Sequence, residues 1–296
     1  MDSVSVMVPC STSNLGSGFD TLGLALNVHT RVTLNRAEGN GVKLHAVGSP
    51  LPKGAEELCA KAAKTFFEAS AIPPFGAEVS VSGDVPVARG LGFSSTVRAG
   101  IVAGLNKLAE TKHSRDDVVQ LVTNLEGHPD NASPAVLGGF TVSGMVNGKA
   151  RCLRFDVEPI LKAVTLIPKF HVRTEEAREL LPNQFTKADT AHALNRSALI
   201  VAAFAAKNYE ALRGVFDDRF HQPHRLKLVP QLDRVITAGV SAGALGGFLS
   251  GSGSSIICLT LRNSQDVAAA MHAALPDSDV KVLSPENKGL TVENVE

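Results

Sequence analysis

A glycine-rich loop that leads directly into a helical segment is the clearest chemical signal in the chain. It runs Pro86-Val-Ala-Arg-Gly-Leu-Gly-Phe-Ser-Ser-Thr96, and the helix is predicted over roughly 94–109. Such a turn exposes backbone N–H groups beside the positive end of a helix dipole, which can bind phosphate without any particular side chain. The hydroxyls of Ser94, Ser95 and Thr96 could cap the helix or reach a Mg²⁺ ion held by phosphates. The pattern is neither a Walker A loop nor a dinucleotide fingerprint. An ordinary turn with a Ser/Thr cap is the alternative interpretation.

A second cluster of polar side chains follows the next predicted helix, at 114–125. It runs Glu126-Gly-His-Pro-Asp-Asn131 and places four functional side chains within six residues. A carboxylate here could ligate Mg²⁺, and an amide or a second carboxylate could orient a substrate hydroxyl. The alternative is a polar helix end that Pro129 terminates.

Two further glycine-containing turns carry polar residues. In Ser11-Thr-Ser-Asn-Leu-Gly-Ser-Gly-Phe-Asp20, the side chains of Asn14 and Asp20 bracket a tight turn. They could offer an acceptor and a donor to the ammonium or hydroxyl group of an amino acid, although Asn and Asp are common in any turn. Gly246-Gly-Phe-Leu-Ser-Gly-Ser-Gly253 favours close backbone approach to a ligand or to another loop, with a hairpin-like turn as the alternative.

Composition argues against several classes of protein. The 296 residues include 29 Lys and Arg against 29 Asp and Glu, without a basic run or an acidic tail. Neither nucleic acid nor an anionic membrane is therefore expected as the main partner. Four scattered cysteines without a CxxC pair are typical of a reduced cytoplasmic chain. We find no signal-peptide pattern and no apolar run long enough to span a bilayer, and we expect a cytoplasmic protein.

A mixed set of strands and helices must position these clusters. Apolar patterning predicts strands at 4–8, 29–36, 42–47, 77–82, 138–146, 162–168, 256–259 and 279–283. It predicts helices at 55–70, 94–109, 114–125, 174–181, 188–206, 208–217, 230–239 and 264–274. Because strands and helices mix without strict alternation, an α+β fold is favoured over a doubly wound sheet. We place a soft domain boundary near residue 160, which gives domains at 1–160 and 161–296.

The combination of motifs resembles the GHMP kinases, the family that acts on galactose, homoserine, mevalonate and phosphomevalonate. The family's phosphate loop, Pro-x-x-x-Gly-Leu-Gly-Ser-Ser, is matched by Pro86, Gly90, Leu91, Gly92 and Ser94. Within the family, the resemblance is strongest to the members that act on homoserine. It covers Val8–Gly23, Glu126–Asn131 with Pro134 and Leu137–Gly139, Thr174–Arg178, Asp218–Arg225 and Phe248–Ser254. Five motifs in the family's order make coincidence improbable.

The resemblance implies a two-domain fold. The N-terminal domain would be like the second domain of ribosomal protein S5 and would bind ATP, and the C-terminal domain would be ferredoxin-like. The expected product is O-phospho-L-homoserine, on the route to threonine. A homodimer is expected from the family alone.

The resemblance also implies a set of site residues. ATP would lie over the loop formed by Pro86, Val87, Ala88, Arg89, Gly90, Leu91, Gly92, Phe93, Ser94, Ser95 and Thr96. Mg²⁺ would be held by Ser94 and Glu126. L-homoserine would be contacted by Asn14, Asp20, His128, Asn131, Thr174, Arg178 and Arg225. Asn131 would align the substrate hydroxyl, and Asp130 is the candidate for a general base, although members that act on homoserine are generally thought to work without one.

One residue departs from the family pattern and keeps alternatives open. Phe93 stands where the family usually has the first Ser of Gly-Leu-Gly-Ser-Ser. Either its ring turns away from the nucleotide, or ATP binding and activity are reduced. The rival functions are another GHMP kinase, for mevalonate or a sugar, and a catalytically inactive binding or regulatory protein. Arg178 and Arg225 favour an amino-acid carboxylate, which guanidinium groups bind in a bidentate manner.

Overall fold

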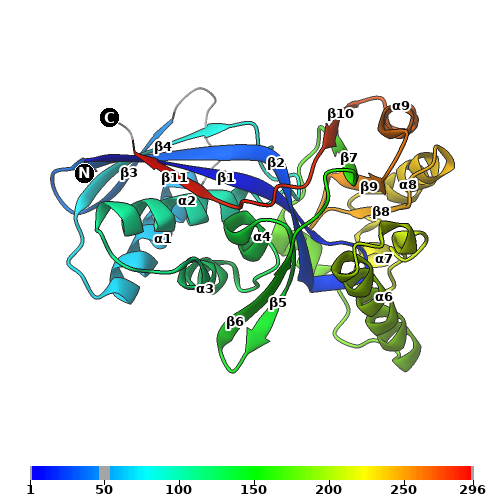
Figure 1. Cartoon of the computed structure of the whole chain (residues 1–296), viewed down its shortest axis with the longest axis horizontal. Coiled ribbons are helices and arrows are strands. Elements are labelled where there is room, and N and C mark those ends of the chain that lie inside the picture. Colours follow the sequence, from blue (N-terminus) through cyan, green and yellow to red (C-terminus); the bar gives the residue numbers. More distant parts are fainter. Residues whose placement is uncertain (1, 47–53, 295–296) are drawn as a thin grey trace.

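The computed structural model describes residues 2–46 and 54–294 and contains two β-sheets (Figure 1). The first sheet is formed by β1 (Ser3–Asn14), β2 (Gly18–Ala37), β3 (Gly41–Ala46), β4 (Gly76–Gly83), β5 (Phe140–Val146), β6 (Lys149–Phe155) and β11 (Thr291–Asn294). The second sheet is formed by β7 (Lys162–Pro168), β8 (Gly246–Leu249), β9 (Ile256–Thr260) and β10 (Ser278–Leu283). The α+β class predicted from the sequence is confirmed.

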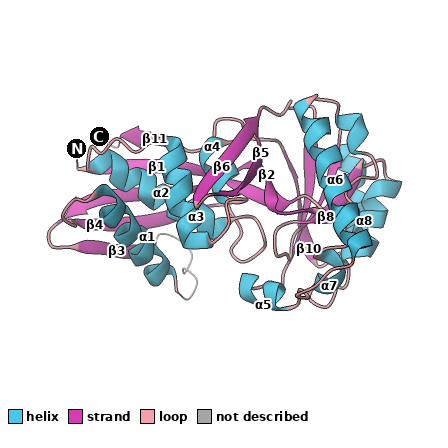
Figure 2. Ribbon diagram, turned by 90° about the horizontal axis from the view of Figure 1, so that it is seen from below, coloured by secondary structure: helices cyan, strands magenta, loops and turns pink. Residues whose placement is uncertain are grey.

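The first sheet has the order β11-β1-β2-β4-β3, with β5 paired to β2 and β6 paired to β5. Strands β3 and β4 run parallel, and the other pairs are antiparallel. Four helices pack against one face, as Figures 1 and 2 show. They are α1 (Ala55–Ser70), α2 (Phe93–Leu108), α3 (Arg115–Glu126) and α4 (Ala132–Leu137). The face of β1 that meets them carries the fully buried Val4, Val6 and Val8, in the alternation that the sequence predicted.

Local signals fix where α3 begins and ends. The Ser114 hydroxyl accepts a hydrogen bond from the N–H of Asp117, and the Asp117 carboxylate accepts one from the N–H of Ser114. This reciprocal capping box stabilises the first turn. At the other end, Gly127 has a φ of +87°, in the left-handed region that terminates helices. The helix therefore ends with Glu126, beside the first turn of α2.

The second sheet is antiparallel throughout, in the order β10-β7-β9-β8. Ile256 and Cys258 of β9 face the core that includes α8 (Leu232–Ser241) and α9 (Ser264–Ala274). Alternate residues of β9, Ile257 and Leu259, face a separate core shared with α6 (Lys187–Ala205).

The core beside α6 also joins the two sheets. It contains Leu22 and Leu24 of β2, and Phe140 of β5 stacks on Phe204 of α6 with ring centroids 4.0 Å apart. The remaining short helices are α5 (Thr174–Glu179), α7 (Gln222–Arg225) and a 3₁₀ turn at Tyr209–Leu212. This shared core fixes the geometry of any cleft between the sheets.

The structure corrects several predicted elements. The helix predicted over 208–217 is wrong beyond the short 3₁₀ turn, because Gly214 adopts a φ of +74° and the chain then leaves the helical path. β2 begins at Gly18 rather than near residue 29, and α5 ends two residues before 181. The elements α4, α7, β6, β8 and β11 were not predicted. Residue 47, at the end of the strand predicted over 42–47, lies outside the described residues.

The boundary near residue 160 falls between β6 and β7, where the chain passes from one sheet to the other. The last strand, β11, returns to pair with β1, so residues near the C-terminal end belong to the first sheet. The division into 1–160 and 161–296 stays a proposal. No helix within the two described ranges is both long and apolar enough to cross a membrane.

Candidate active site

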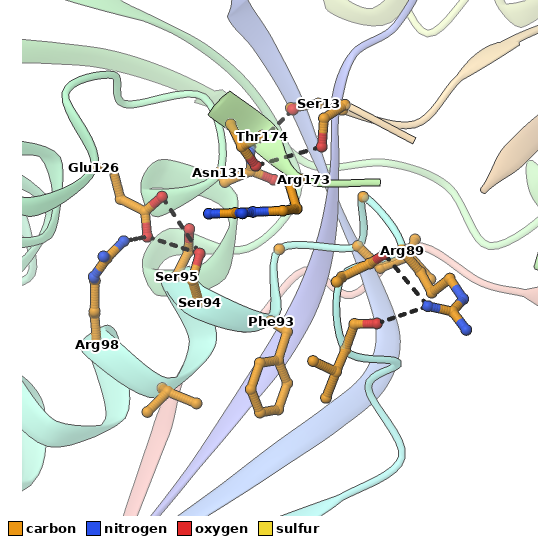
Figure 3. A pocket seen from close by; sticks show the side chains of 18 of the residues that line it. Ser13, Arg89, Phe93, Ser94, Ser95, Arg98, Glu126, Asn131, Arg173 and Thr174 are labelled. Atoms are coloured by element: carbon orange, nitrogen blue, oxygen red, sulfur yellow. Dashed lines mark hydrogen bonds and ion pairs between the residues drawn. The ribbon is translucent and has the colours of Figure 1, made fainter. Parts of the chain in front are cut away.

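A cleft of about 550 Å³ opens between the two halves of the chain. This volume falls within the range of roughly 300 to 1,000 Å³ that is usual for small-molecule sites. Its lining comes from residues 13–20, the start of α1, the loop after β4, the first turns of α2, the segment after α3, the start of α5 and the loop at 251–252. The four motifs that the sequence singled out therefore meet at one place, part of which Figure 3 shows.

The loop between β4 and α2 requires glycine at two positions. Gly90 and Gly92 have φ angles of +73° and +68°. A Cβ atom on Gly90 would lie 2.0 Å from the carbonyl oxygen of Ser250, and one on Gly92 would lie 2.4 Å from the Ser11 hydroxyl. The Ser250 hydroxyl also donates to the Gly90 carbonyl at 2.6 Å. The glycine-rich run around Ser250 thus makes a close approach to another loop, one of the two interpretations left open by its sequence.

The side chains of this loop do not all face the cleft. Residues 87–95 line it, whereas Pro86 and Thr96 do not. The Thr96 hydroxyl is buried and hydrogen bonds with Thr30 at 2.8 Å, so its placement argues against contact with a nucleotide. The Arg89 guanidinium donates to the carbonyls of Pro168 and Lys169 at 2.8 and 2.7 Å, and it braces the loop against the end of β7.

Phe93 points away from the polar part of the cleft. Its ring is partly buried and packs against the apolar cores of both halves. Figure 3 shows the ring directed away from Ser94 and Glu126. The ring therefore turns away from the side of the cleft that holds Ser94 and Glu126 and lines its apolar side with Leu44 and Leu58. Which of the two possibilities for ATP binding holds stays a prediction.

Ser94 and Glu126 come together as expected, with a third partner that the sequence analysis missed. The Ser94 hydroxyl donates to Oε1 of Glu126 at 3.1 Å and lies 3.5 Å from Oε2. The Arg98 guanidinium donates to the same Oε1. Arg98 follows Ser94 by four residues on α2, and this spacing places both on one side of the helix. The spacing of four residues between Ser94 and Arg98 was the signal in the sequence that could have identified Arg98.

Asn131 is held in a fixed orientation by two serines of β1. The Ser11 hydroxyl donates to Oδ1 of Asn131 at 3.0 Å, and Nδ2 of Asn131 donates to the Ser13 hydroxyl at 3.0 Å. Asp130 is 2% exposed, and its carboxylate accepts hydrogen bonds from the His128 ring and from the N–H of Asn131. Asp130 is therefore already engaged as an acceptor, which weakens the case for it as a free base.

Asn14, Asp20 and Arg178 meet at the other side of the cleft. The Asp20 carboxylate accepts two hydrogen bonds from the Arg178 guanidinium, at 3.0 and 2.6 Å. Oδ1 of Asn14 accepts from the N–H of Asp20, and Nδ2 of Asn14 donates to the Gly251 carbonyl at 3.2 Å. Thr174, at the start of α5, lines the cleft close to Ser252.

Arg225 is a buried cation with a different set of partners. It is 2% exposed and donates to the carbonyls of Ala177 and Gly251 and to Nδ1 of His221. It forms no ion pair with a carboxylate among residues 2–46 and 54–294. Burial lowers the pKa of Arg225 to about 10, and the nearby positive charge of Arg178 acts in the same direction. An anionic ligand group would relieve both effects.

His221 and Asp218 hold Arg225 in place, and neither was assigned a role of its own from the sequence. Nε2 of His221 donates to the Gly16 carbonyl at 2.8 Å, which leaves Nδ1 as the acceptor for Arg225. Burial lowers the pKa of His221 to about 4. The buried Asp218 carboxylate accepts from the N–H groups of His221 and Gln222 and so fixes the start of α7.

One further group has metal-binding geometry. Potential ligand atoms of Asp20, His128 and Asp130 lie within 4.8 Å of one another. Arg178 occupies the Asp20 carboxylate, however, and His128 and Asp130 bond to each other. We interpret the group as a polar cradle for a substrate, since its charges are already balanced by side chains.

Two family descriptions match the chain, "GHMP kinases N terminal domain" over residues 57–139 and "GHMP kinases C terminal" over residues 200–277. The chain belongs to the GHMP kinase family. The two-domain fold expected from the resemblance is confirmed with it.

Several similar proteins are named homoserine kinase, and more distant solved structures with the same fold include a mevalonate kinase at 16% identity and a TM-score of 0.69. A homoserine kinase of Caldicellulosiruptor bescii is 34% identical over 300 residues, covering 99% of this chain and 98% of its own. A homoserine kinase of Persephonella marina is 35% identical over 300 residues, covering 100% of both chains. The crystal structure of homoserine kinase from Cytophaga hutchinsonii has a TM-score of 0.89 and 28% identity, and the match covers 99% of this chain and 98% of that one.

Replacing Phe93 by Ser should change the Kd for ATP by less than about tenfold, or about 1.4 kcal/mol. The reason is that the loop binds phosphate through its backbone, while the ring packs against apolar residues. Calorimetric titration of ATP with Mg²⁺ into the natural protein, Phe93→Ser and the apolar control Phe93→Leu measures this. A natural protein that fails to bind ATP, with binding restored in Phe93→Ser, contradicts the prediction.

Acid should destabilise the fold through His221. The folded protein holds this ring neutral, with a pKa lowered to about 4, whereas the unfolded chain binds a proton below the ordinary value of 6.5. The stability that depends on the neutral ring is present above pH 6.5 and is lost as pH falls towards 4. His221→Gln should flatten this part of the pH profile of urea unfolding, whereas His45→Gln, at an exposed position of β3, should not. Equal acid sensitivity of the natural protein and His221→Gln counts against this account.

Proposed function

We propose that the protein transfers the γ-phosphoryl group of ATP to the side-chain hydroxyl of L-homoserine and forms O-phospho-L-homoserine. The single observation that carries the substrate assignment is the position of Arg225 beside Arg178, in a cleft that also holds a phosphate-type loop. Arg225 is a buried guanidinium that has no carboxylate partner in the part of the chain that the structure describes. A small substrate with its own carboxylate would satisfy both guanidinium groups.

The nucleotide end of the cleft is supported by backbone geometry. Gly92 caps α2 in the left-handed conformation, so the first N–H groups of the helix are directed towards the cleft without a side-chain cap. These N–H groups and the positive end of the helix dipole would hold the ATP phosphates. Because most of this interaction comes from the backbone, the lost hydroxyl at Phe93 removes only one contact.

Mg²⁺ fits the oxygen donors at the same end. The Ser94 hydroxyl and the Glu126 carboxylate face each other, and Oε2 of Glu126 has only the long contact with Ser94 among the described residues. Hard oxygen ligands of this kind suit Mg²⁺. When bound, Mg²⁺ would supply positive charge to the phosphates during transfer. The protein's part is to hold Ser94 and Glu126 where these oxygens converge.

The remaining side chains would orient the substrate. The carboxylate would bind Arg225 and Arg178, and the ammonium group would lie near the Asp20 carboxylate and Oδ1 of Asn14. His128, with its proton-accepting partner Asp130, completes this polar wall. Thr174, at the start of α5, would form part of the wall around the bound substrate. Asn131, fixed by the serines of β1, would align the hydroxyl towards the γ-phosphorus.

Transfer needs one bond to form and one to break. The substrate oxygen bonds to the γ-phosphorus, the bond from that phosphorus to the oxygen shared with ADP breaks, and the hydroxyl proton is released. Because such transition states are loose, positioning and charge neutralisation provide most of the catalysis. We therefore assign Asp130 a positioning role through His128 rather than that of an obligatory base.

The proposed reaction also implies a metabolic role and a cellular compartment for the protein. A kinase with this product would serve threonine biosynthesis in the cytoplasm, and the free thiols of all four cysteines suit that reducing compartment. We further propose the domain boundary near residue 160 and a homodimer.

The function is tested by coupled assay of ADP release with ATP, Mg²⁺ and a panel of alcohols. We expect L-homoserine to give the highest kcat/KM and mass spectrometry to identify O-phospho-L-homoserine. A higher kcat/KM for mevalonate or a hexose would overturn the assignment of L-homoserine as the substrate. The chain would still belong to the GHMP kinase family. Absence of turnover with every alcohol, despite ATP binding, would favour a binding or regulatory protein.

Arg225→Ala should raise the KM for L-homoserine strongly and leave the KM for ATP nearly unchanged. Losing a charge-assisted contact to a buried carboxylate costs about 2 to 5 kcal/mol. Because Arg225 also holds two carbonyl groups, Arg225→Lys serves as a second variant that keeps the charge and should lose less. Arg213→Ala removes an exposed arginine and is the control. If the KM for ATP rises instead, Arg225 belongs to the nucleotide site.

A further inference from the structure

The pair formed by Arg98 and Glu126 is not explained by the proposed reaction. Arg98 lies on the second turn of α2, and its guanidinium donates to the carboxylate that would ligate Mg²⁺ (Figure 3). Both side chains are largely covered, with exposures of 18% and 9%. A mobile surface pair would be far more exposed, so this contact is part of the built site.

The guanidinium of Arg98 is only partly satisfied. Its Nε atom is buried and has no hydrogen-bond partner among the residues that the structure describes. A buried donor without a partner is costly, and buried charges are normally hydrogen bonded on all sides. Arg98 also lines the cleft. Arg98 is therefore incompletely hydrogen bonded in its contact with Glu126, at the wall where phosphates would bind.

Helix geometry explains how Arg98, one turn further along α2 than Ser94, reaches the Glu126 carboxylate. Side chains on a helix lean towards its N-terminus, so the long Arg98 side chain returns to the level of Ser94. The contact of Ser94 and Arg98 with the same Oε1 of Glu126 confirms that all three groups share one level. The guanidinium thus stands beside the N-terminal end of α2, where anions are favoured.

We propose that Arg98 is a phosphate-binding residue, which exchanges its contact with Glu126 for a phosphate oxygen of the bound nucleotide. The proposal rests on the kinase function above. The ATP phosphates would offer the guanidinium new anionic partners close to Glu126, and a cation that occupied Glu126 would further favour this exchange. Arg98 would thereby add positive charge to the phosphates in the bound complex.

A double-mutant cycle separates this role from simple support of Glu126. ATP is titrated by calorimetry, in the presence of EDTA, into the natural protein, Arg98→Met, Glu126→Gln and the double variant. Arg98→Met should weaken metal-free ATP binding by about tenfold to a hundredfold, the usual value of a charge-assisted contact. The loss should persist when Arg98→Met is made in the Glu126→Gln protein, where no orphaned carboxylate is left.

Controls keep the outcomes distinct. Lys107→Met removes an exposed positive charge from the far end of the same helix and should leave ATP binding unchanged. Equal ATP affinity of Glu126→Gln and the double variant would show that Arg98 acts only through Glu126, and this overturns the proposal. Failure of the natural protein to bind metal-free ATP at millimolar concentration would overturn it as well.

The same experiment is independent of the substrate assignment. If Arg98 strengthens metal-free ATP binding while homoserine is not turned over, the inference stands and the proposed substrate fails. If homoserine is phosphorylated while Arg98→Met binds metal-free ATP normally, only the inference fails. Should Arg98→Met fold poorly, Arg98→Lys in the Glu126→Gln protein tests the same contact, with retained charge and an expected intermediate affinity.

Discussion

The site depends on the close packing of the loop before α2 against two other glycine-containing segments. Gly90 lies against the backbone at Ser250, and Gly92 lies against Ser11 at the end of β1. Larger residues at either position would push these segments apart. Because Ser250 comes from the second half of the chain and Ser11 from the first, this contact sets the width of the cleft. The orientation of Asn131 depends on it too, since Ser11 holds its amide.

The charges of the cleft are largely balanced before any ligand binds. Arg178 pairs with Asp20, His128 with Asp130 and Arg98 with Glu126. Such pairs avoid the desolvation cost of isolated buried charges. Arg225 is different, because its partners are carbonyl groups and a neutral histidine. A ligand carboxylate is thus favoured at one position, while elsewhere ligands must exchange with existing partners.

Most of the residues assigned to the candidate site line one cleft, whereas several of the elements that carry them were not predicted. A loop that binds through its backbone needs glycine at particular positions. The loop before α2 could therefore be located from the spacing of Gly90 and Gly92. Residues that only orient other side chains have no recognisable sequence pattern of this kind. Ser11 and Ser13 belong to a run that the sequence predicted as a turn, and nothing in that run indicates their contacts with Asn131. His221 likewise became visible only once the fold placed it between Gly16 and Arg225.

The errors in the fold have a similar cause. The segment 208–217 has the composition of a helix, but packing decides otherwise, since a Cβ atom on Gly16 would lie 2.5 Å from the carbonyl oxygen of Phe216. The chain leaves the helical path at Gly214, whose φ is +74°, before it reaches this contact. Strand β11 has no distinctive pattern of its own, and it forms because β1 offers an unpaired edge. Contacts between residues far apart in sequence therefore determined these elements.

Phe93 departs from the family's phosphate-loop pattern, and Arg98 was not predicted as a site residue. Both lie within the first two turns of α2. One removes a hydroxyl from the loop, and the other brings a guanidinium to the neighbouring carboxylate. The two changes act on different faces, because the Phe93 ring packs against the apolar cores while Arg98 faces Glu126. Anion binding by backbone N–H groups tolerates the first change, since no side chain is essential to it. The second change brings a charged donor to the site, and its direct contact with a phosphate can be separated from its support of Glu126 only where that carboxylate is neutralised.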